Sequence, residues 1–450
     1  MNNYRLLITL LCVTLCALTA IPQEMVSAHS VSWASPSDTL LSIDEIMSLA
    51  DANSKQLRPL ISGLREAEEG VKVAKSNRLP QLNVDLSFSY LGDGFVTDRN
   101  FANFEVAPIP HYGNNLSFEA SQVIFAGGAI SNGIAVANLY QDLASQQLED
   151  KRNNIHFTLI GYYLDIYKCR NMRQVLVDNI EQTRGVIKEM VAREKEGIVL
   201  ENDITRYELL LSNLELALTN INNTLSILNR NMCTALGLED HLTIIPDTTI
   251  LHKNIPNLDR HYWQENALHN SSVLKIADTG VKISKKQENI VQAERLPHLA
   301  LFAGYHLDGP ITIEVPPIDK NFSYWCVGVN INYNISSLFK TNKKLSQSRI
   351  ATKKAREQYD AVEEEIFLAI NADYTRYMEA YEEYKTQQKS VELAIQNYNV
   401  TANRYRNDMA LITDMLDASN AKLDAEQKLV NAQINILYYY YKLQYISGLL

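Results

Sequence analysis

Proline is absent from two long stretches of this 450-residue chain, residues 111–245 and 318–450. Because proline breaks the interior of a helix, both stretches can hold very long helices. The chain also has no run of basic residues, and its formal net charge of −10 leaves no electrostatic footprint for nucleic-acid binding. Its apolar fraction of 46% is ordinary, which argues against a multi-helix membrane protein but not against a β-barrel, whose strands are only half apolar.

Cysteine is scarce as well, with five residues in the whole chain. Two of them, Cys12 and Cys16, lie near the N-terminus. The other three, Cys169, Cys233 and Cys326, are far apart and odd in number, so they show neither metal-ligand spacing nor a disulfide framework. We expect these three to be buried small apolar residues.

Catalytic signatures are missing too. The sequence contains no G-x-x-x-x-G-K-[ST] phosphate loop, no G-x-S-x-G nucleophile elbow and no H-E-x-x-H zinc motif. His252, His261 and His269 lie between the two halves of the chain without the spacing of metal ligands. We therefore predict a protein that is not an enzyme, with no catalytic residues, no metal site and no cofactor.

The N-terminus has the layout of an export signal. Arg5 supplies a positive start, residues 6–20 form a short apolar run, and Val26-Ser27-Ala28 is a small-residue cleavage site. We therefore predict a signal peptide over residues 1–28 and export of the mature chain.

Three other interpretations of this segment are weaker. A membrane anchor needs about 20 apolar residues, and this run has about 15. Cleavage after Ala20 is a second interpretation. Lipid attachment at Cys16 is a third, and it is disfavoured because Leu15 is bulky where a small residue is needed.

Hydrophobic spacing predicts coiled-coil helices in the two proline-free stretches. One seam has apolar side chains alternately three and four residues apart, at Tyr207, Leu211, Leu214, Leu218, Ile221, Leu225, Leu228, Met232 and Ala235. A second seam of the same spacing runs from Tyr374 to Tyr405, and a stripe rich in small residues runs from Ala418 to Leu443.

Each proline-free stretch is predicted to be a helical hairpin. The first runs over 131–196, turns at Gly197 and returns over 201–236, and the second spans 341–446 with its turn near Asp408. Glycine accepts a left-handed backbone at no steric cost, and aspartate tolerates it better than most residues. A helix of about 65 residues is about 100 Å long, so the pattern predicts a rod or a tube.

Four segments of about ten residues alternate apolar with polar side chains, as strands do. They begin near Leu82, Leu116, Leu299 and Trp325. About ten residues is the length that a tilted strand needs to cross a bilayer, and one apolar face with one polar face suits a barrel with lipid outside and water inside. A half-buried sheet in a soluble domain would alternate in the same way, but the export signal and the strand length favour the membrane.

Four strands cannot close a barrel. Open sheet edges are not tolerated in lipid, and the smallest single-chain barrels use eight strands. If these strands span a membrane, several copies of the chain must pool them, and we therefore predict an oligomer. A general diffusion porin is disfavoured because porin chains carry enough strands to close alone.

The chain also repeats itself. Arg78-Leu79-Pro80 precedes the first predicted strand, and Arg295-Leu296-Pro297 precedes the third. We therefore divide the mature chain into a first repeat over 41–237, a linker over 238–258 and a second repeat over 259–448. Each repeat is predicted to contain a helix, two strands and a long helical hairpin.

Taken together, these features resemble the TolC family of outer-membrane efflux proteins. The resemblance rests on the order of the elements, the repeat, the R-L-P strand entries and the segment Thr413-Asp414-Met415-Leu416-Asp417-Ala418. In both halves an aspartate, Asp203 or Asp414, lies six residues beyond the turn. The resemblance covers nearly the whole mature chain.

The resemblance implies a mainly α protein with a membrane β-barrel part. Long antiparallel coiled-coil hairpins would form a trimeric α-barrel in the periplasm, and four strands per protomer would complete a shared twelve-stranded β-barrel in the lipid of the outer membrane. The homotrimer would dock through a periplasmic adaptor protein onto an inner-membrane transporter. It would be the passive exit duct of a tripartite efflux pump or a type I secretion system.

The resemblance also implies a gate at the periplasmic tip. In the family, two aspartates of a D-x-x-D-A pattern line the aperture as rings, and Asp414 and Asp417 match them. Threefold symmetry would bring like carboxylates together at a narrow pore, which raises their pKa values and attracts cations. The plainer interpretation is two solvated acids on a helix face, one of them near the helix N-terminus.

Tyr405 and Asp203 match two members of the contacts that lock this gate in the family. An arginine expected two residues after the second turn is missing, since Ala410 stands there, and Asn202 replaces the usual threonine. The predicted lock is therefore incomplete. Tyr405 also belongs to the coiled-coil seam and has an equally good interpretation as a packing residue.

The alternative function is a structural coiled-coil protein of the periplasm or the cell surface, with its sheet buried in a soluble domain and without transport activity. Charges placed at Val84 and Val329 separate the two hypotheses. Lipid-facing strands would then fail to insert while the helices still fold, whereas packed strands would unfold their domain.

Overall fold

The computed structural model describes residues 39–239, 242–247, 258–314 and 317–450. All of these residues belong to one compact unit. The predicted signal peptide, together with Cys12, Cys16 and His252, lies outside the described residues.

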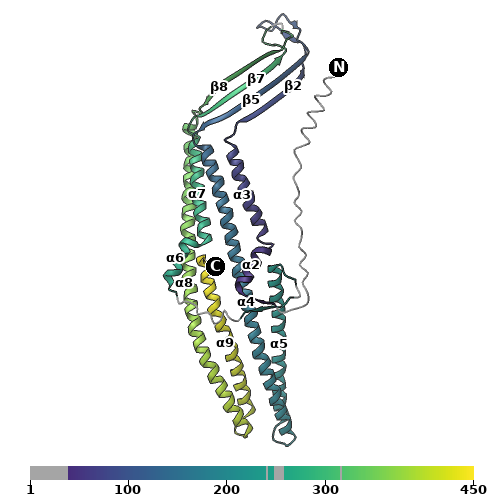
Figure 1. The fold of residues 1–450 in the computed structure, drawn as a ribbon, viewed down its shortest axis with the longest axis vertical. Helices are drawn as coiled ribbons and strands as arrows, with labels where there is room; N and C mark the ends of the chain where they lie inside the picture. The colour runs from purple at the N-terminus through teal and green to yellow at the C-terminus, as the bar shows by residue number, and fades with distance from the viewer. Residues whose placement is uncertain (1–38, 240–241, 248–257, 315–316) are drawn as a thin grey trace. The chain divides into compact units, whose positions relative to one another are not determined.

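Long helices dominate the described chain, as predicted (Figure 1). They are α2 (Ile43–Asn53), α3 (Arg58–Ser76), α4 (Ala129–Glu194), α5 (Glu201–Leu236), α6 (Arg260–Asn270), α7 (Ser272–Ala293), α8 (Ser337–Arg406) and α9 (Ile412–Ser447). Helices α4 and α8 are continuous over 66 and 70 residues, about 100 Å each. Helix α4 pairs with α5 and α8 pairs with α9, which confirms both hairpins.

The coiled-coil seams lie where the helices meet. Tyr207, Leu214 and Met232 of α5 are buried, and the remaining positions of that seam are partly buried. In α8, Tyr377 and Tyr398 are buried. The spacing of three and four residues therefore identified the packed face of these helices correctly.

The four predicted strands are confirmed and form one antiparallel sheet in the order β2-β5-β7-β8. They are β2 (Gln81–Tyr90), β5 (Tyr112–Ala126), β7 (His298–Gly309) and β8 (Phe322–Asn332). Strand β8 ends at Asn332, so Tyr333 and Ile335 lie beyond it. A turn begins there, in which the Ser337 N–H donates to the Asn334 carbonyl at 2.9 Å and leads the chain into α8.

The register of the sheet keeps the apolar side chains in common rows. Val84 pairs with Phe118, Phe118 with Tyr305, and Tyr305 with Trp325. On the other face, Asp85 pairs with Ser117 and Ser117 with His306. A difference of one residue in any pairing would mix the two faces, so the register itself maintains one apolar and one polar surface.

Strict alternation along β5 would continue the apolar row from Gln122 to Ile124, but a bulge changes this. The pairing of β5 with β7 shifts between Val123 and Phe125, so Phe125 lies opposite Leu299. Such a bulge inserts an extra residue into one strand and reverses the alternation beyond it. Phe125 therefore continues the apolar row in place of Ile124.

Two short sheets were not predicted. Strand β1 (Thr39–Leu41) pairs in parallel with β6 (Ile244–Pro246), a segment that the sequence analysis assigned to the linker. The chain between β2 and β5 contains a small hairpin of β3 (Gly94–Val96) and β4 (Glu105–Ala107).

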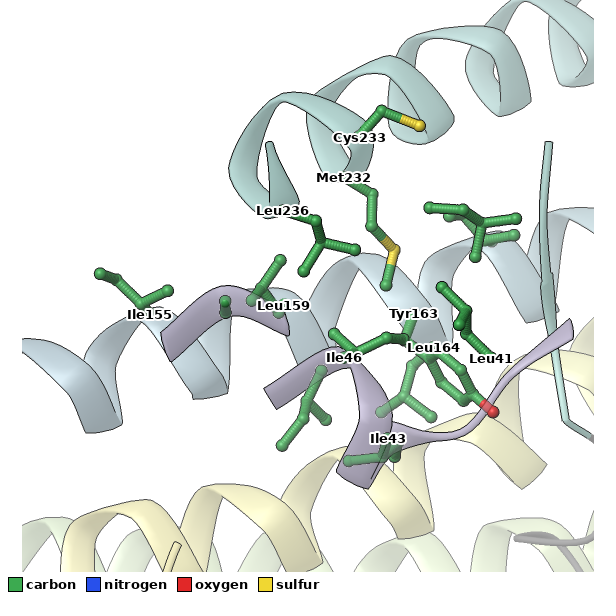
Figure 2. Packing of buried hydrophobic residues seen from close by; sticks show 14 of the residues in the cluster. Leu41, Ile43, Ile46, Ile155, Leu159, Tyr163, Leu164, Met232, Cys233 and Leu236 are labelled. Atoms are coloured by element: carbon green, nitrogen blue, oxygen red, sulfur yellow. The ribbon is translucent and has the colours of Figure 1, made fainter. Parts of the chain in front are cut away.

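A large apolar core surrounds the sheet of β1 and β6. Figure 2 shows side chains of α2, α4 and α5 directed toward one another there, including Ile46, Leu159 and Met232. The Tyr163 hydroxyl is buried beside them and donates to the Asp247 carbonyl at 3.0 Å. Burial raises the pKa of Tyr163 to about 12. Distant parts of the sequence therefore meet in this core.

The predicted burial of the cysteines is confirmed for Cys169 and Cys233, which are free thiols in the interior. Cys326 differs, because it is only half-buried. It lies on the polar face of the sheet, opposite Gly304 of β7.

Glu288 of α7 is a buried acid in the contact between α7 and α8. Its carboxylate accepts from Lys285 Nζ at 3.0 Å and from the Thr352 hydroxyl at 3.2 Å, and Arg349 lies 3.7 Å away. Burial disfavours the charged form, but these partners outweigh it and lower the pKa of Glu288 below its ordinary value. The acid therefore holds α7 and α8 together in its ionised form.

Candidate functional site

The two hairpin tips have the same backbone design. Gly197 has φ of +80° and Asp408 has φ of +57°, so both turns use a left-handed residue. Glycine pays no steric penalty for that conformation, whereas aspartate tolerates it at a cost of about 1 kcal/mol. The left-handed backbone at Asp408 therefore costs free energy, and a contact of the Asp408 side chain can offset this cost.

The hydrogen bonds that close the two tips are also equivalent. The Ile198 N–H donates to the Arg193 carbonyl at 3.1 Å, and the Met409 N–H donates to the Arg404 carbonyl at 2.8 Å. This bond, from the residue after the left-handed position back to the last helical turn, defines a Schellman cap. Both long helices thus end in the same way, one turn before the return helix begins.

An apolar cluster lies under the tips and joins the two hairpins. Its buried members are Met190, Val199, Ile204, Tyr207, Tyr398, Ala402, Ile412, Met415 and Ala418, and Tyr405 packs against them. Tyr207 is 1% exposed, and burial raises its pKa far above the ordinary value. These residues come from α4, α5, α8 and α9 and, for Val199, from the first turn, so the tips of both hairpins form one packed unit.

Arg193 connects the two tips with a single side chain. Its guanidinium is ion-paired with the Asp408 carboxylate and donates to the Tyr405 carbonyl at 3.3 Å. The same group lies over the Tyr405 ring, 5.5 Å from the ring centroid, within the range of a cation–π contact. The Arg193 side chain is only 15% exposed, which is low for an arginine in the last turn of a helix.

The role of Arg193 was not predicted from the sequence. In the sequence it is one of several charged residues before Gly197, and its partners lie 212 and 215 residues away. No local pattern could have separated it from the solvated face of α4. The arginine that the TolC resemblance required two residues after the second turn is absent, and Arg193 reaches the same region from the other hairpin.

Tyr405 and Asp203 lie near each other at the tip. Burial raises the pKa of Tyr405, the charge of Arg193 opposes this shift, and the negative charge of Asp203 adds to it. In the described part of the chain, no hydrogen bond joins the two side chains. The contact that ties Tyr405 to the first hairpin is therefore made by Arg193.

Asp414 and Asp417 lie on the exposed surface of α9. The Asp414 carboxylate accepts from the Leu411 N–H at 3.0 Å, which stabilises the first turn of the helix. Within one protomer, neither acid joins the cluster around Tyr405. Asp417 lies about one turn further along α9, and its carboxylate is free to face whatever surrounds the tip.

Further polar contacts cross from α4 to the second hairpin above the tips. Arg406 lies 3.5 Å from Glu189, and Lys422 Nζ donates to the Gln182 side chain at 2.7 Å. Lys422 also lies over the Tyr398 ring, 5.2 Å from its centroid. The two hairpins are thus joined by polar groups along the whole segment near the tips.

The sheet of β2, β5, β7 and β8 is the second feature with functional meaning. Its apolar face is exposed in the protomer, with Val84 at 60%, Val329 at 58% and Trp325 at 76%. A continuous apolar surface of this kind marks contact with another apolar phase or partner. Strands β2 and β8 are the edges of the sheet, and neither has a second partner strand in the described chain.

No helix in the described ranges combines the length and apolar character needed to cross a membrane. Among the same residues, no group of three or more His, Cys, Asp or Glu side chains could hold a metal ion.

Comparison with known proteins agrees with this architecture. Residues 263–448 match the sequence model of the family described as outer membrane efflux protein. No curated protein is similar enough to the chain in sequence to be matched.

Solved structures match nearly the whole chain. The outer-membrane channel OprN superposes with a TM-score of 0.75 at 15% identity, over 90% of this chain and 89% of that chain. VceC from Vibrio cholerae gives 0.73 at 15% identity, over 90% and 96%. CusC gives 0.76 at 12% identity, over 93% and 95%.

These identities are low, so the structural matches establish the fold alone, and the sequence match to the family covers the second half of the chain. The TolC resemblance is confirmed to this extent: residues 263–448 match the family described as outer membrane efflux protein, and the described chain has the fold of the solved outer-membrane channels.

Proposed function

We propose that this protein is the outer-membrane channel of a tripartite efflux pump or a type I secretion system. It would be a passive trimeric exit duct that is gated at its periplasmic tip, and it would act as a conduit and not as an enzyme. The match of residues 263–448 to the outer membrane efflux protein family supports a place in the outer membrane and a role in efflux. The trimer, the gate and the partners rest on the arguments below.

The open edges of the sheet carry the proposal. Strands β2 and β8 are unpaired on one side, and the apolar face between them is exposed. In a bilayer every backbone N–H and C=O needs a partner, so β2 of one copy must pair with β8 of the next until the ring closes. Three copies would supply twelve strands, enough for a channel.

The helices point to the same assembly. Leu209 and Leu216 of α5 are 64% and 60% exposed, seven residues apart on one face. Leu393 and Val400 of α8 are 52% and 51% exposed with the same spacing. A seam of period seven is typical of a helix that packs against a neighbouring helix, and α5 and α8 are free to do so between copies. We infer that the repeats, 41–237 and 259–448, alternate around the ring.

At the tip, rings of Asp414 and Asp417 would form the gate, with Tyr405, Asp203 and Arg193 holding it shut. Charge would gather at the narrowest point because threefold symmetry brings each carboxylate near its two copies. An adaptor protein in the periplasm and a transporter in the inner membrane would be the partners. The energy for transport would come from that transporter.

Membrane insertion tests the channel. A lysine at Val84 would face lipid, where a charge at the bilayer midplane costs about 2–4 kcal/mol, whereas a lysine at its neighbour Asn83 would face water. We expect Val84→Lys to fold its helices yet fail to enter the outer membrane, and Asn83→Lys to insert normally. Unfolding of Val84→Lys with loss of the helical signal would favour the alternative, a soluble coiled-coil protein.

Conductance in planar bilayers tests the gate. Asp414→Asn combined with Asp417→Asn should weaken the preference for cations and the block by multivalent cations. The capping bond of Asp414 survives in the amide variant, because an asparagine oxygen also accepts from an N–H. Unchanged selectivity and unchanged block would reject the acidic rings while leaving the channel intact.

A further inference from the structure

The two hairpin tips can be superimposed residue by residue along the sequence. Each functional position of the first tip has a counterpart 211 residues later: Arg193 and Arg404, Gly197 and Asp408, Asp203 and Asp414. The left-handed turns and the closing hydrogen bonds are equivalent at both. The counterpart of Arg193 is therefore an arginine at the same place on the same kind of cap.

The two arginines nevertheless have different surroundings in the protomer. Arg193 is mostly buried against Tyr405 and Asp408 of the second hairpin. Arg404 is exposed and makes no ion pair with any described residue. Within one chain the second hairpin has the first hairpin on one side only. By the repeat, Arg404 belongs to the opposite side, which has no neighbouring hairpin within the chain.

The repeat identifies what Arg404 would meet. The residue that corresponds to Tyr405 in the first hairpin is Glu194, 211 positions earlier. Glu194 is exposed and is likewise without an ion pair in the described ranges. Arg404 and Glu194 thus hold the positions that correspond to Arg193 and Tyr405 in the contact between the hairpins, and they carry opposite charges.

We propose that the tip contact of Arg193 recurs between copies, with Arg404 of one copy bound to Glu194 of the partner subunit. This rests on the ring of hairpins in the proposed function. In such a ring the first hairpin of each copy lies beside the second hairpin of the same copy. That second hairpin in turn lies beside the first hairpin of the next copy, in an equivalent arrangement. The tip would then be held by arginine contacts that alternate within and between subunits.

The alternation gives the two contacts different strengths. Arg193 has an aromatic ring, a carbonyl and a carboxylate as partners, whereas Arg404 would have an exposed carboxylate. Exposed ion pairs are weak and are screened by salt. The contact between copies is therefore the weaker of the two.

Cross-linking in the native membrane tests the contact directly. The variant carries Arg404→Cys and Glu194→Cys in a background with Cys169, Cys233 and Cys326 replaced by serine, and a short bismaleimide is added. We expect covalent dimers and trimers on denaturing gels. The matched control, Asn403→Cys with Glu194→Cys, moves one thiol by about 100° around α8 and should give at least fivefold less cross-linked product.

The charges are tested by reversal. Arg404→Glu should weaken the trimer against dissociation by heat in detergent, and Arg404→Glu with Glu194→Arg should restore it. Equal cross-linking by the test and control pairs, or no rescue by the double reversal, would overturn the inference while a trimer is still present. A protein that is monomeric in the membrane by native mass measurement would overturn the proposed function as well.

Discussion

Removal of the Arg193 side chain should loosen the connection between the two hairpin tips. The guanidinium makes an ion pair with Asp408, which is 65% exposed and therefore contributes only about 0.2–1 kcal/mol. The cation–π contact with Tyr405 adds about 0.5–1 kcal/mol, and the bond to the Tyr405 carbonyl adds a charged hydrogen bond. Since these contacts share one side chain, they do not add fully.

We therefore expect Arg193→Ala to reduce the coupling between the tips by about 1–3 kcal/mol, which shifts the ratio of joined to separated tips about 5–150-fold. The coupling between the tips in Arg193→Lys should lie between that of the native protein and that of Arg193→Ala, because lysine keeps the charge but lacks the planar guanidinium. Lys188→Ala removes the same charge from an exposed position of α4 and serves as the control.

The assay is a distance measurement by pulsed electron paramagnetic resonance. Spin labels at Ala192 and Asn403, both exposed, report the separation of α4 and α8 at the tip without any need for conduction. Arg193→Ala should broaden the distance distribution toward larger values, and the native protein should broaden slightly from low to 1 M salt as the Asp408 pair is screened. Identical distributions in Arg193→Ala and Lys188→Ala would refute the reasoning.

Three further predictions follow from the described packing. Leu159→Ala removes a side chain that is 1% exposed in the core of Figure 2, so it should lower the free energy of unfolding by about 2–5 kcal/mol, measured by loss of the helical circular dichroism signal on heating. Gly197→Ala forces a Cβ into a left-handed backbone and should lower the free energy of unfolding by about 1 kcal/mol, although no atom lies within 4 Å of the added carbon. Gly185→Ala, at an equally open position in the interior of α4, should instead raise the free energy of unfolding by about 0.5–1 kcal/mol. Equal effects of the two substitutions would contradict the argument. The lowered pKa of Glu288 means that its contribution to stability is complete above about pH 4.5 and is lost as the pH falls through the lower folded-state value, so Glu288→Gln should flatten the acid side of the stability curve, and an unchanged curve would exclude this role.

The long helices and the strands could be predicted because their signals are local. A proline-free stretch with apolar residues three and four apart predicts a helix, and the alternation of side chains along β2 and β7 predicts a strand. The signals for the two turns were local as well, since glycine and aspartate, found at Gly197 and Asp408, are suited to a left-handed backbone. The predicted ends of α4 and α8 were accordingly off by only a few residues.

The errors occurred where the outcome depended on a partner strand. The bulge between Val123 and Phe125 exists because β5 must stay in register with β7, and nothing in the sequence of β5 alone reveals an extra residue. Strand β6 is three residues long and is formed by its pairing with β1, about two hundred residues earlier. Local propensity is too weak to predict either one.

The sequence by itself determined the long helices and the four strands of the large sheet, together with their order, because each of these follows from residue spacing and turn chemistry along the chain. Only the tertiary structure decided which charged residue joins the two hairpin tips. Arg193 and Arg404 hold equivalent positions before the two turns, and only Arg193 is buried against Tyr405. The free energy of an ion pair depends on distance and on solvent exposure, and both are set by segments that the fold brings together from opposite halves of the chain.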